Sequence, residues 1–249
     1  TVANFFSQFN DIMMEMTNMV MMAAPIGVYC LIARTFSNIG FSGFIPMAKY
    51  MLCVLGALAI HCLGSYSALM AIFTRLNPYR FIRKYFPVMS FAFSTATSNA
   101  TIPMAIETLD EKIGVSKKIS SFTIPLGATI NMGGAAITIT VMTLACVNTL
   151  GMEVPLAMKV LLSFVAAISA CGASGVAGGS LLLIPLACSL FGIPNDVAMQ
   201  VVGVGFIIGV IQDSCETGLN SSTDALFTAA ADFHDMKKAG KDIWAWRKK

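Results

Sequence analysis

Two segments near the start of the chain have the length and the apolar character of simple membrane-spanning helices. They cover about residues 12–33 and 47–73, and each is close to the ~20 apolar residues that one bilayer crossing requires. Within hydrocarbon a helix satisfies every backbone polar group inside its own segment. We therefore predict two spanning helices here.

Two later apolar runs are too long for single crossings. No Asp, Glu, Lys or Arg occurs in residues 119–152 or in residues 160–195. As one helix, the 36 residues of the second run would be ~54 Å long, against a hydrocarbon core of ~30 Å. Glycines in its middle disfavour a continuous helix. We predict a broken span over about residues 119–150 and a re-entrant hairpin over about residues 157–192.

Clusters of basic residues flank another segment, about residues 86–109. A single crossing would put one cluster on each side of the membrane, whereas the positive-inside rule favours both in the cytoplasm. The centre of the segment, residues 94–103, reads STATSNATIP and is rich in hydroxyl groups. We therefore predict a re-entrant hairpin here too. The clusters are Arg75, Arg80, Arg83 and Lys84 before it, and Lys112, Lys117 and Lys118 after it.

The remaining pattern completes the predicted topology. A last span covers about residues 197–230, and a basic cytoplasmic tail covers residues 231–249. Counting the predicted crossings places the connection that contains Arg34 and Lys49 outside the cell, which conflicts mildly with the positive-inside rule. The predicted fold class is all-α membrane: a transport-domain core with two oppositely oriented re-entrant helical hairpins and partly unwound transmembrane helices. Inverted repeats of broken helices are a recurring transporter architecture.

The composition also indicates that the solvent of this chain is the lipid bilayer. Of its 249 residues, 56% are hydrophobic and 12% are charged, about half of the ~25% charged residues of soluble domains. The basic residues are clustered and do not form a stripe interleaved with aromatic residues, so nucleic acid is not a predicted partner. The seven cysteines contain no CxxC pair, so neither zinc nor a disulfide framework is predicted.

The last span carries five polar residues on one face. At ~100° per residue, Asn220 and Asp224 each lie ~20° from Asp213 around the helix. Thr217 lies ~40° away, and Glu216 lies ~60° away on the other side. Three acids without a basic partner in a span are costly to bury, so we expect a cation, sodium or an ammonium group, to visit them. The predicted far side of the helix holds Ile211, Leu219 and Leu226.

Three kinds of protein could use this polar face. An intramembrane aspartyl protease would need Asp213 and Asp224 to share a proton, but ~16 Å of helix separates them. A channel also uses carbonyl oxygens and acidic residues, but paired hairpins of opposite sidedness favour alternating access. No GxxxxGK[ST] motif supports an ATP-driven pump. We therefore predict a secondary active transporter, which is not an enzyme.

Four motifs, in the same order, resemble the sodium:dicarboxylate symporter family, the glutamate-transporter homologues. STATSNATIP stands where the family has its serine-rich hairpin tip, and PLGATINMGGAA at residues 125–136 resembles the family's PLGATINMDGTA. The glycine-rich residues 169–180 resemble its second hairpin tip. DSCETGLNSSTD at residues 213–224 resembles the acid–Asn–acid pattern of its last helix. The resemblance begins at APIG, residues 24–27, and covers nearly the whole chain.

The resemblance implies binding sites for an amino acid and for sodium. Asp213 would hold the ammonium group of the substrate, Asn220 and the first hairpin tip its α-carboxylate, and Gly175 would lie in a gate. The implied substrate-binding residues are Ser98, Asn99, Gly175, Asp213, Glu216, Thr217 and Asn220. The implied sodium ligands are Gly127, Asn131, Asn220 and Asp224 for one ion, with Thr129 and Ser169 near a second ion.

Four departures from the family pattern bear on the substrate and on the ions. Glu216 stands where relatives that carry acidic amino acids have arginine, and an anion there would repel such substrates by roughly several kcal/mol. Ala96 and Ala135 also replace side chains that face an acidic substrate in relatives. We predict small neutral substrates, serine and threonine, with alanine as a further candidate. Gly133 replaces an aspartate that helps to bind a further sodium ion, so fewer coupled ions are expected.

The resemblance also implies a cellular setting. Members are multi-pass proteins of the cell inner (plasma) membrane in bacteria, and they are usually homotrimers joined by scaffold helices upstream of the transport core. The chain opens at Thr1 in a non-basic stretch. We therefore expect that the N-terminal part of the protein is missing here, and that the lipid bilayer and further copies of the protein are its partners.

Overall fold

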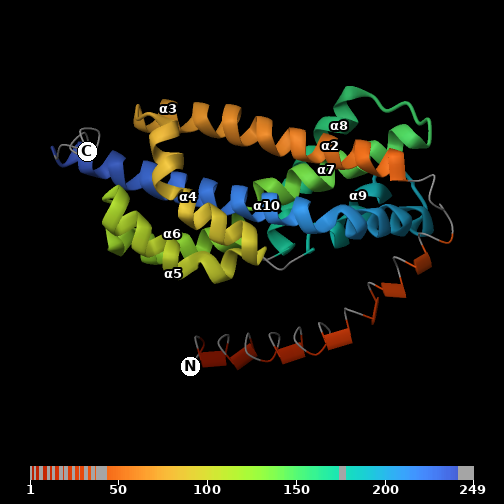
Figure 1. Cartoon of the computed structure of the whole chain (residues 1–249), viewed down its shortest axis with the longest axis horizontal. Helices are drawn as coiled ribbons and strands as arrows, with labels where there is room; N and C mark the ends of the chain where they lie inside the picture. Colours follow the sequence, from red (N-terminus) through yellow and green to blue (C-terminus); the bar gives the residue numbers. More distant parts are fainter. Residues whose placement is uncertain are drawn as a thin grey trace. The chain divides into compact units, whose positions relative to one another are not determined.

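The computed structural model of the chain describes residues 44–173 and 178–240 continuously, and separate positions between residues 2 and 37 (Figure 1). All secondary structure in the described part is helical, and no described residue belongs to a strand. The predicted all-α class is therefore confirmed.

The chain divides into two compact units, Thr1–Phe44 and Ile45–Lys249. In the first unit every described residue is helical, and the predicted span at residues 12–33 is described only in part. The second unit contains all of the elements that build the polar site.

The second unit begins with a long helix that contains a π-helical turn. α2 (Phe44–Ile60) runs directly into the π-helix η2 (His61–Tyr66) and then into α3 (Ser67–Thr74). Residues 48–74 are long and apolar enough to cross a membrane. Arg75 ends the helix in the left-handed conformation, with φ 54°. A π-helical turn rotates the following residues around the axis and often marks a functional site.

α4 (Pro78–Thr95) and α5 (Ser98–Thr108) form a helical hairpin. The side chain of Asn77 begins α4 by accepting a hydrogen bond from a backbone N–H of the first turn, at 3.0 Å. Ala96 ends α4 in the left-handed conformation, with φ 49°, and only Thr97 separates it from α5. The tip of the hairpin therefore lies inside the hydroxyl-rich motif.

Two of the basic residues that flank this hairpin in the sequence meet at its base. The short π-helix η3 (Leu109–Ile113) continues α5. The ammonium group of Lys84 donates to the carbonyl oxygen of Lys112 at 2.9 Å, which links the first arm of the hairpin to the end of the second. One residue from each predicted basic cluster thus lies at the same end of the hairpin.

α6 (Lys117–Ile130) and α7 (Gly133–Thr149) are the two halves of a helix that is interrupted at Asn131 and Met132. Asn131, with φ −87° and ψ 71°, leaves the helical region. The two halves together are long and apolar enough to cross a membrane. Non-helical backbone at that depth is tolerated only where protein buries it or where it lines a cavity.

A second pair of helical arms packs on α7. α8 (Leu156–Ala170) leads into η4 (Cys171–Ala173), and η5 (Leu181–Leu183) leads into α9 (Ile184–Ser189). Residues 174–177, which include the predicted gate residue Gly175, lie outside the described residues. The buried core between α7, α8 and α9 consists of Met132, Ala135, Ile139, Leu162, Ala166, Ala170 and Ala187.

α10 (Asn195–Lys238) is a continuous helix of 44 residues, ~66 Å long, and it packs against most other elements of the second unit. In Figure 1, α4, α5 and α6 lie along its C-terminal half, and α7, α8 and α9 lie along its N-terminal half. The helix extends beyond the predicted end at residue 230, because Asp232 and Phe233 of the last turns are buried. Both groups of helices therefore share one central element.

Two buried tyrosines fasten α10 to the helices beside it. The hydroxyl of Tyr66 donates to the backbone carbonyl of Ser222 at 2.9 Å, and the hydroxyl of Tyr85 lies 3.1 Å from the hydroxyl oxygen of Ser221. Tyr66 comes from η2 and Tyr85 from α4, so consecutive residues of α10 are held from two directions. These bonds fix the rotation of α10 about its axis.

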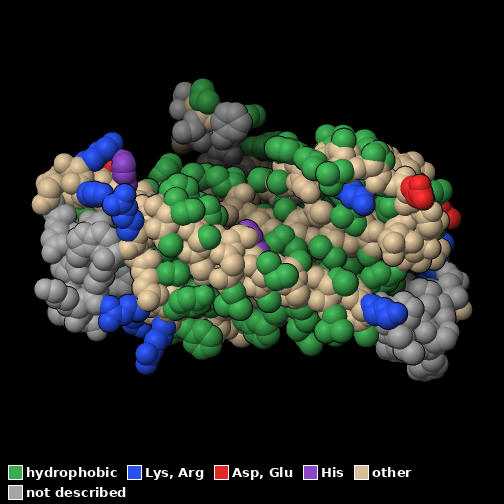
Figure 2. Space-filling view, turned by 90° about the horizontal axis from the view of Figure 1, so that it is seen from above, with side chains coloured by type: hydrophobic (Ala, Val, Ile, Leu, Met, Phe, Trp, Pro, Cys, Tyr) green, Lys and Arg blue, Asp and Glu red, His purple; other side chains and the backbone are tan. Residues whose placement is uncertain are grey.

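The outer surface of the second unit is apolar. Leu156, Ile168, Phe122 and Val210 are each 70% exposed or more. Figure 2 shows hydrophobic side chains across the middle of this unit, with Lys and Arg side chains towards its two ends. Water-soluble proteins rarely expose so much contiguous apolar surface. With four helices of sufficient length and hydrophobicity in the described part, this is the surface of a membrane protein.

Asp232 caps the start of α6 from the last turns of α10. Its carboxylate accepts a hydrogen bond from the backbone N–H of Ser116 at 2.8 Å, and the side chain is 4% exposed. We expect Asp232→Ala to lower the thermal unfolding midpoint of the complete protein in detergent, because losing such a cap costs about 1 kcal/mol. The matched control is Asp235→Ala, whose side chain is exposed. Equal midpoints for the two variants would show that this cap does not stabilise the fold.

Candidate functional site

The five polar residues predicted to share one face of α10 lie in the interior of the second unit. Glu216, Thr217, Asn220 and Asp224 are between 4% and 7% exposed, and Asp213 is half-buried. Leu219 and Leu226, predicted on the far side of α10 from these polar residues, are buried too, because helices cover α10 on several sides. Ile211, predicted on the same side, is exposed.

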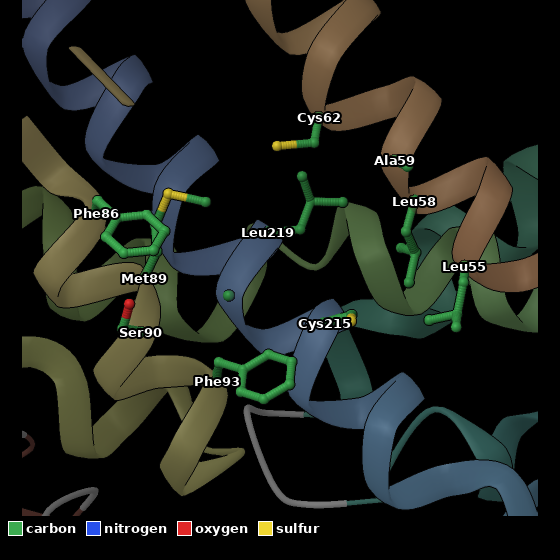
Figure 3. Close-up of a pocket in the computed structure, with 11 residues that line it drawn as sticks. Leu55, Leu58, Ala59, Cys62, Phe86, Met89, Ser90, Phe93, Cys215 and Leu219 are labelled. Carbon is green, nitrogen blue, oxygen red and sulfur yellow. The ribbon is translucent and has the colours of Figure 1, made fainter. Parts of the chain in front are cut away.

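The opposite side of α10 borders an apolar groove of about 520 Å³ between α2, η2, α4 and α10 (Figure 3). Cys215, Gly218 and Leu219 form the α10 wall of this groove. At ~100° per residue, these three lie on the far side of the helix from Asp213. The polar face of α10 is therefore directed toward α6, α7 and the second hairpin. The other lining residues are Leu55, Leu58, Ala59, Cys62, Phe86, Met89, Ser90 and Phe93.

Glu216 is held by three hydrogen bonds to one of its two oxygens. Its Oε2 accepts from the hydroxyl of Thr138 at 2.8 Å, from the amide of Gln212 at 2.8 Å and from the hydroxyl of Ser180 at 3.1 Å. Thr138 belongs to α7 and Ser180 follows the second hairpin tip. Hydrogen bonds of this kind to a charged group offset the cost of burying it. Glu216 thereby joins three elements in one network.

Asp213 contacts the same hairpin segment through the backbone. Its Oδ2 accepts a hydrogen bond from the N–H of Gly178 at 3.0 Å. Gly178 has φ 72°, a conformation that a glycine adopts readily. Asp213 and Glu216, about one turn apart on α10, thus bind residues 178 and 180 of one short segment.

Two asparagines join the helix break to α10. The side-chain oxygen of Asn220 accepts from the backbone N–H of Gly134 at 2.7 Å, and its amide contacts the sulfur of Met132 at 3.5 Å. The amide of Asn131 donates to the carbonyl of Asn220 at 3.3 Å and to the hydroxyl of Thr223 at 3.0 Å. These contacts satisfy backbone and amide groups that the break between α6 and α7 leaves without helical partners.

Asp224 lies directly against the backbone of Gly127. A Cβ atom at Gly127 would overlap the carboxylate of Asp224, so only glycine allows this approach. The carboxylate has no hydrogen-bond or ion-pair partner within the described part of the chain, although the residue is only 7% exposed. It borders a cavity of about 330 Å³ together with Gly127 and Asn131. The other residues lining this cavity are Thr123, Leu126, Ile130, Phe227 and Thr228.

The predicted surroundings of a second ion are brought together only in part. The thiol of Cys171 donates to the carbonyl of Ile130 at 3.3 Å, which places the end of α6 beside η4. The hydroxyl of Thr129 donates to Pro125 O at 3.1 Å, and the hydroxyl of Ser169 donates to Val165 O at 2.7 Å. Both hydroxyl protons are thus used within their own helices, and their oxygens keep lone pairs.

Ser98 and Asn99 stand at the first turn of α5. Ser98 is 4% exposed, and its carbonyl accepts from the hydroxyl of Thr101 at 2.6 Å, whereas Asn99 is exposed. No hydrogen bond joins either side chain to Asp213 or Asn220 in the described part of the chain. The structure therefore gathers predicted residues of α6, of the α6–α7 break and of α10, but within the described residues it does not bond the first hairpin tip to them.

Some residues of this site were not predicted from the sequence. Gln212 lies four positions before Glu216 on one helix, so helical spacing alone could have indicated that contact. Thr138 and Ser180 carry no such local signal, because they are far from Glu216 in sequence. Met132 and Gly134 belong to a motif that was recognised, but their bonds to Asn220 depend on tertiary packing.

A bundle of helices of membrane-spanning length, with buried acids facing a helix break, is typical of a membrane transporter. The chain belongs to the sodium:dicarboxylate symporter family, whose sequence profile matches residues 1–233. It is 51% identical over 228 residues to the serine/threonine transporter SstT of Enterococcus faecalis. That alignment covers 90% of this chain and 54% of the relative, so the chain spans about half of the relative's length.

The close approach of Gly127 and Asp224 can be tested by adding a methyl group. We expect Gly127→Ala to lower the thermal unfolding midpoint of the complete protein, because the added carbon displaces the Asp224 carboxylate and overpacking costs about 1–3 kcal/mol. Gly133→Ala is the matched control, since its nearest neighbour would be His61 Nε2 at 3.8 Å, an ordinary contact. The packing argument is wrong if both variants melt at the same temperature.

Proposed function

We propose that the complete protein containing this chain is a secondary active transporter that couples the entry of serine and threonine to sodium by alternating access. Family membership and the identity to a serine/threonine transporter support this proposal. The observation that carries it is the meeting of Gly127, Asn131 and Asp224 around one cavity at a helix break. Sodium favours hard oxygen ligands, and unwound backbone supplies them without further buried charge.

One sodium ion is held by the carbonyl oxygens of Gly127, Asn131 and Asn220 and by the carboxylate of Asp224. The absence of a donor to Asp224 within the described residues supports this assignment, because a buried carboxylate requires a compensating partner. The carbonyl of Gly127 already accepts the N–H of Asn131 at 2.8 Å and retains a second lone pair. A second sodium ion lies near Thr129 and Ser169, where α6 and η4 meet.

The substrate lies between the first hairpin tip, the second hairpin segment and α10. Its ammonium group pairs with Asp213, which is half-buried and accepts only one hydrogen bond in the described part of the chain. Its α-carboxylate is bound by Ser98, Asn99 and Asn220. Ser98 begins an 11-residue helix, and the N-terminus of a helix favours an anion. Thr217, between Asp213 and Asn220 on α10, completes the site, and Gly175 belongs to the gate over it.

Glu216 selects for neutral side chains that can donate a hydrogen bond. Its carboxylate repels acidic substrates, and Ala96 provides no cation and Ala135 no hydroxyl group to bind their side chains. Ala135 is fully buried and Ala96 ends the first arm of the hairpin at the tip. Gly133 provides no carboxylate for a further sodium ion, so fewer ions are coupled than in relatives with aspartate there.

In the membrane, the two hairpins enter from opposite faces and do not cross. Their position along opposite halves of α10 supports this arrangement. The complete protein is a homotrimer in the bacterial inner membrane, with its C-terminal tail in the cytoplasm. The proposed spans are about residues 12–33, 47–73, 119–150 and 197–230, and the re-entrant hairpins are about residues 86–109 and 157–192.

Counterflow in proteoliposomes tests both the carrier mechanism and the sodium site. Vesicles that contain the complete protein and unlabelled serine should accumulate labelled serine in sodium and not in potassium, which a channel cannot do. Asp224→Asn should raise the sodium concentration for half-maximal uptake by about tenfold or more, because it removes the charged ligand. Asp196→Asn is a control at an exposed acid of the same helix. Sodium-independent counterflow would contradict the proposed coupling.

The selectivity assigned to Glu216 has its own test. Glu216→Arg should lower serine uptake at least about tenfold, because a cation replaces the acceptor of three hydrogen bonds. Aspartate, which should not inhibit serine uptake by the unmodified protein, should bind to this variant as a competitor. Glu216→Gln keeps the shape of the side chain and removes its charge, so it separates the effect of the charge on uptake from the effect of side-chain size. Unchanged serine uptake by Glu216→Arg would remove Glu216 from the specificity account.

A further inference from the structure

Each polar hydrogen of the three donor side chains around Glu216 is used in one hydrogen bond. The amide nitrogen of Gln212 donates to the hydroxyl oxygen of Thr138 at 3.1 Å and to Glu216 Oε2 at 2.8 Å, which uses both of its hydrogens. Thr138 accepts that bond and gives its own hydrogen to Glu216 Oε2. Ser180 donates to the same atom. Oε2 therefore only accepts, and the orientation of the carboxylate is determined by its neighbours.

The other oxygen of Glu216 remains available. Oε1 has no hydrogen-bond partner in the described part of the chain. It is also not among the fully buried, unpartnered side-chain atoms of that part, so it keeps some accessible surface. Within that part, Thr143 Oγ1 is the one polar side-chain atom that is both fully buried and unpartnered. A carboxylate oxygen that keeps accessible surface in an otherwise buried residue can accept a hydrogen bond from a bound molecule.

The backbone of α7 sets the position of the Glu216 stem. A Cβ atom at Gly134 would lie 2.9 Å from Glu216 Cγ and 3.1 Å from the side-chain oxygen of Asn220. Both side chains thus pack on one glycine, and Asn220 is the residue proposed to bind the α-carboxylate of the substrate. The side chains of Glu216 and Asn220, about one helical turn apart on α10, are therefore part of the same site.

We propose that Thr138, Ser180 and Gln212 are positioning residues for substrate selection. They hold Oε2 of Glu216 so that Oε1 accepts the hydrogen bond of the substrate's side-chain hydroxyl. This inference rests on the proposed function and adds to it three residues that do not themselves contact the substrate. A carboxylate held in one orientation loses less entropy on binding than a free one, so the hydroxyl group of serine gains more from it.

Ser180 also links the hydrogen-bond network around Glu216 to the segment that contains Gly178. It follows the second hairpin tip, and Gly178 in the same segment donates to Asp213. Asp213, proposed to bind the ammonium group of the substrate, thus holds Gly178 to α10. Glu216, proposed to bind its hydroxyl group, holds Ser180. Binding of serine and docking of this segment depend on the same two carboxylates.

The test compares the donor of Thr138 with its methyl group in the complete protein in proteoliposomes. Thr138→Val keeps the shape and removes the donor, so it should raise the KM for serine about tenfold and change kcat by less than about twofold. Thr138→Ser keeps the donor and loses the methyl group, so its KM should stay near that of the unmodified protein. Ser180→Ala should behave as Thr138→Val does, which provides a second variant if the first folds poorly.

Thr143→Val is the matched control, because Thr143 is a buried threonine of the same helix whose hydroxyl has no partner in the described part. Its KM should be unchanged. The inference is overturned if Thr138→Val and Ser180→Ala keep the original KM, or if Thr138→Ser is as impaired as Thr138→Val. Lack of sodium-dependent serine uptake by the unmodified protein would instead overturn the proposed function itself.

Discussion

Three carboxylates in the middle of an apolar helical bundle are the constraint on which the rest of this structure depends. A buried carboxylate is costly unless hydrogen bonds or a cation compensate it. The three acids of α10 are compensated in different ways. Glu216 receives three side-chain donors and Asp213 one backbone donor, whereas Asp224 receives none within the described residues. The acid without a donor borders a cavity together with Gly127 and Asn131.

The interruptions in the helices follow from the same constraint. A continuous helix uses the N–H groups of its interior internally and has none of these donors to offer a neighbour. At the α6–α7 break, Gly134 donates its N–H to Asn220, and beyond the second hairpin tip Gly178 donates its N–H to Asp213. Glycine is also required for proximity, since any side chain at Gly127 would occupy the place of the Asp224 carboxylate. Breaks and glycines are thus what allow a long polar helix to be buried.

Glu216 is surrounded by hydrogen-bond donors from separate parts of the chain. Thr138, Ser180 and Gln212 all present hydrogen-bond donors to its carboxylate. Three donors on one oxygen stabilise an anion. A cation in the same place could not accept their hydrogen bonds. The identity of one residue is therefore matched by the surroundings that the fold builds for it. Under the proposed function, the specificity of the site depends on the network as well as on the single side chain.

The sequence by itself determined the helical class, the positions of the helix interruptions and the polar face of α10. These are local properties: charge-free length, glycine and proline placement and the ~100° helical period each act over a few residues. Only the tertiary structure decided that Leu219 and Leu226 are buried and that α10 continues to Lys238. It alone paired Thr138 and Ser180 with Glu216, because hydrogen bonds between residues distant in sequence depend on how helices pack around one another, and no local pattern records that packing.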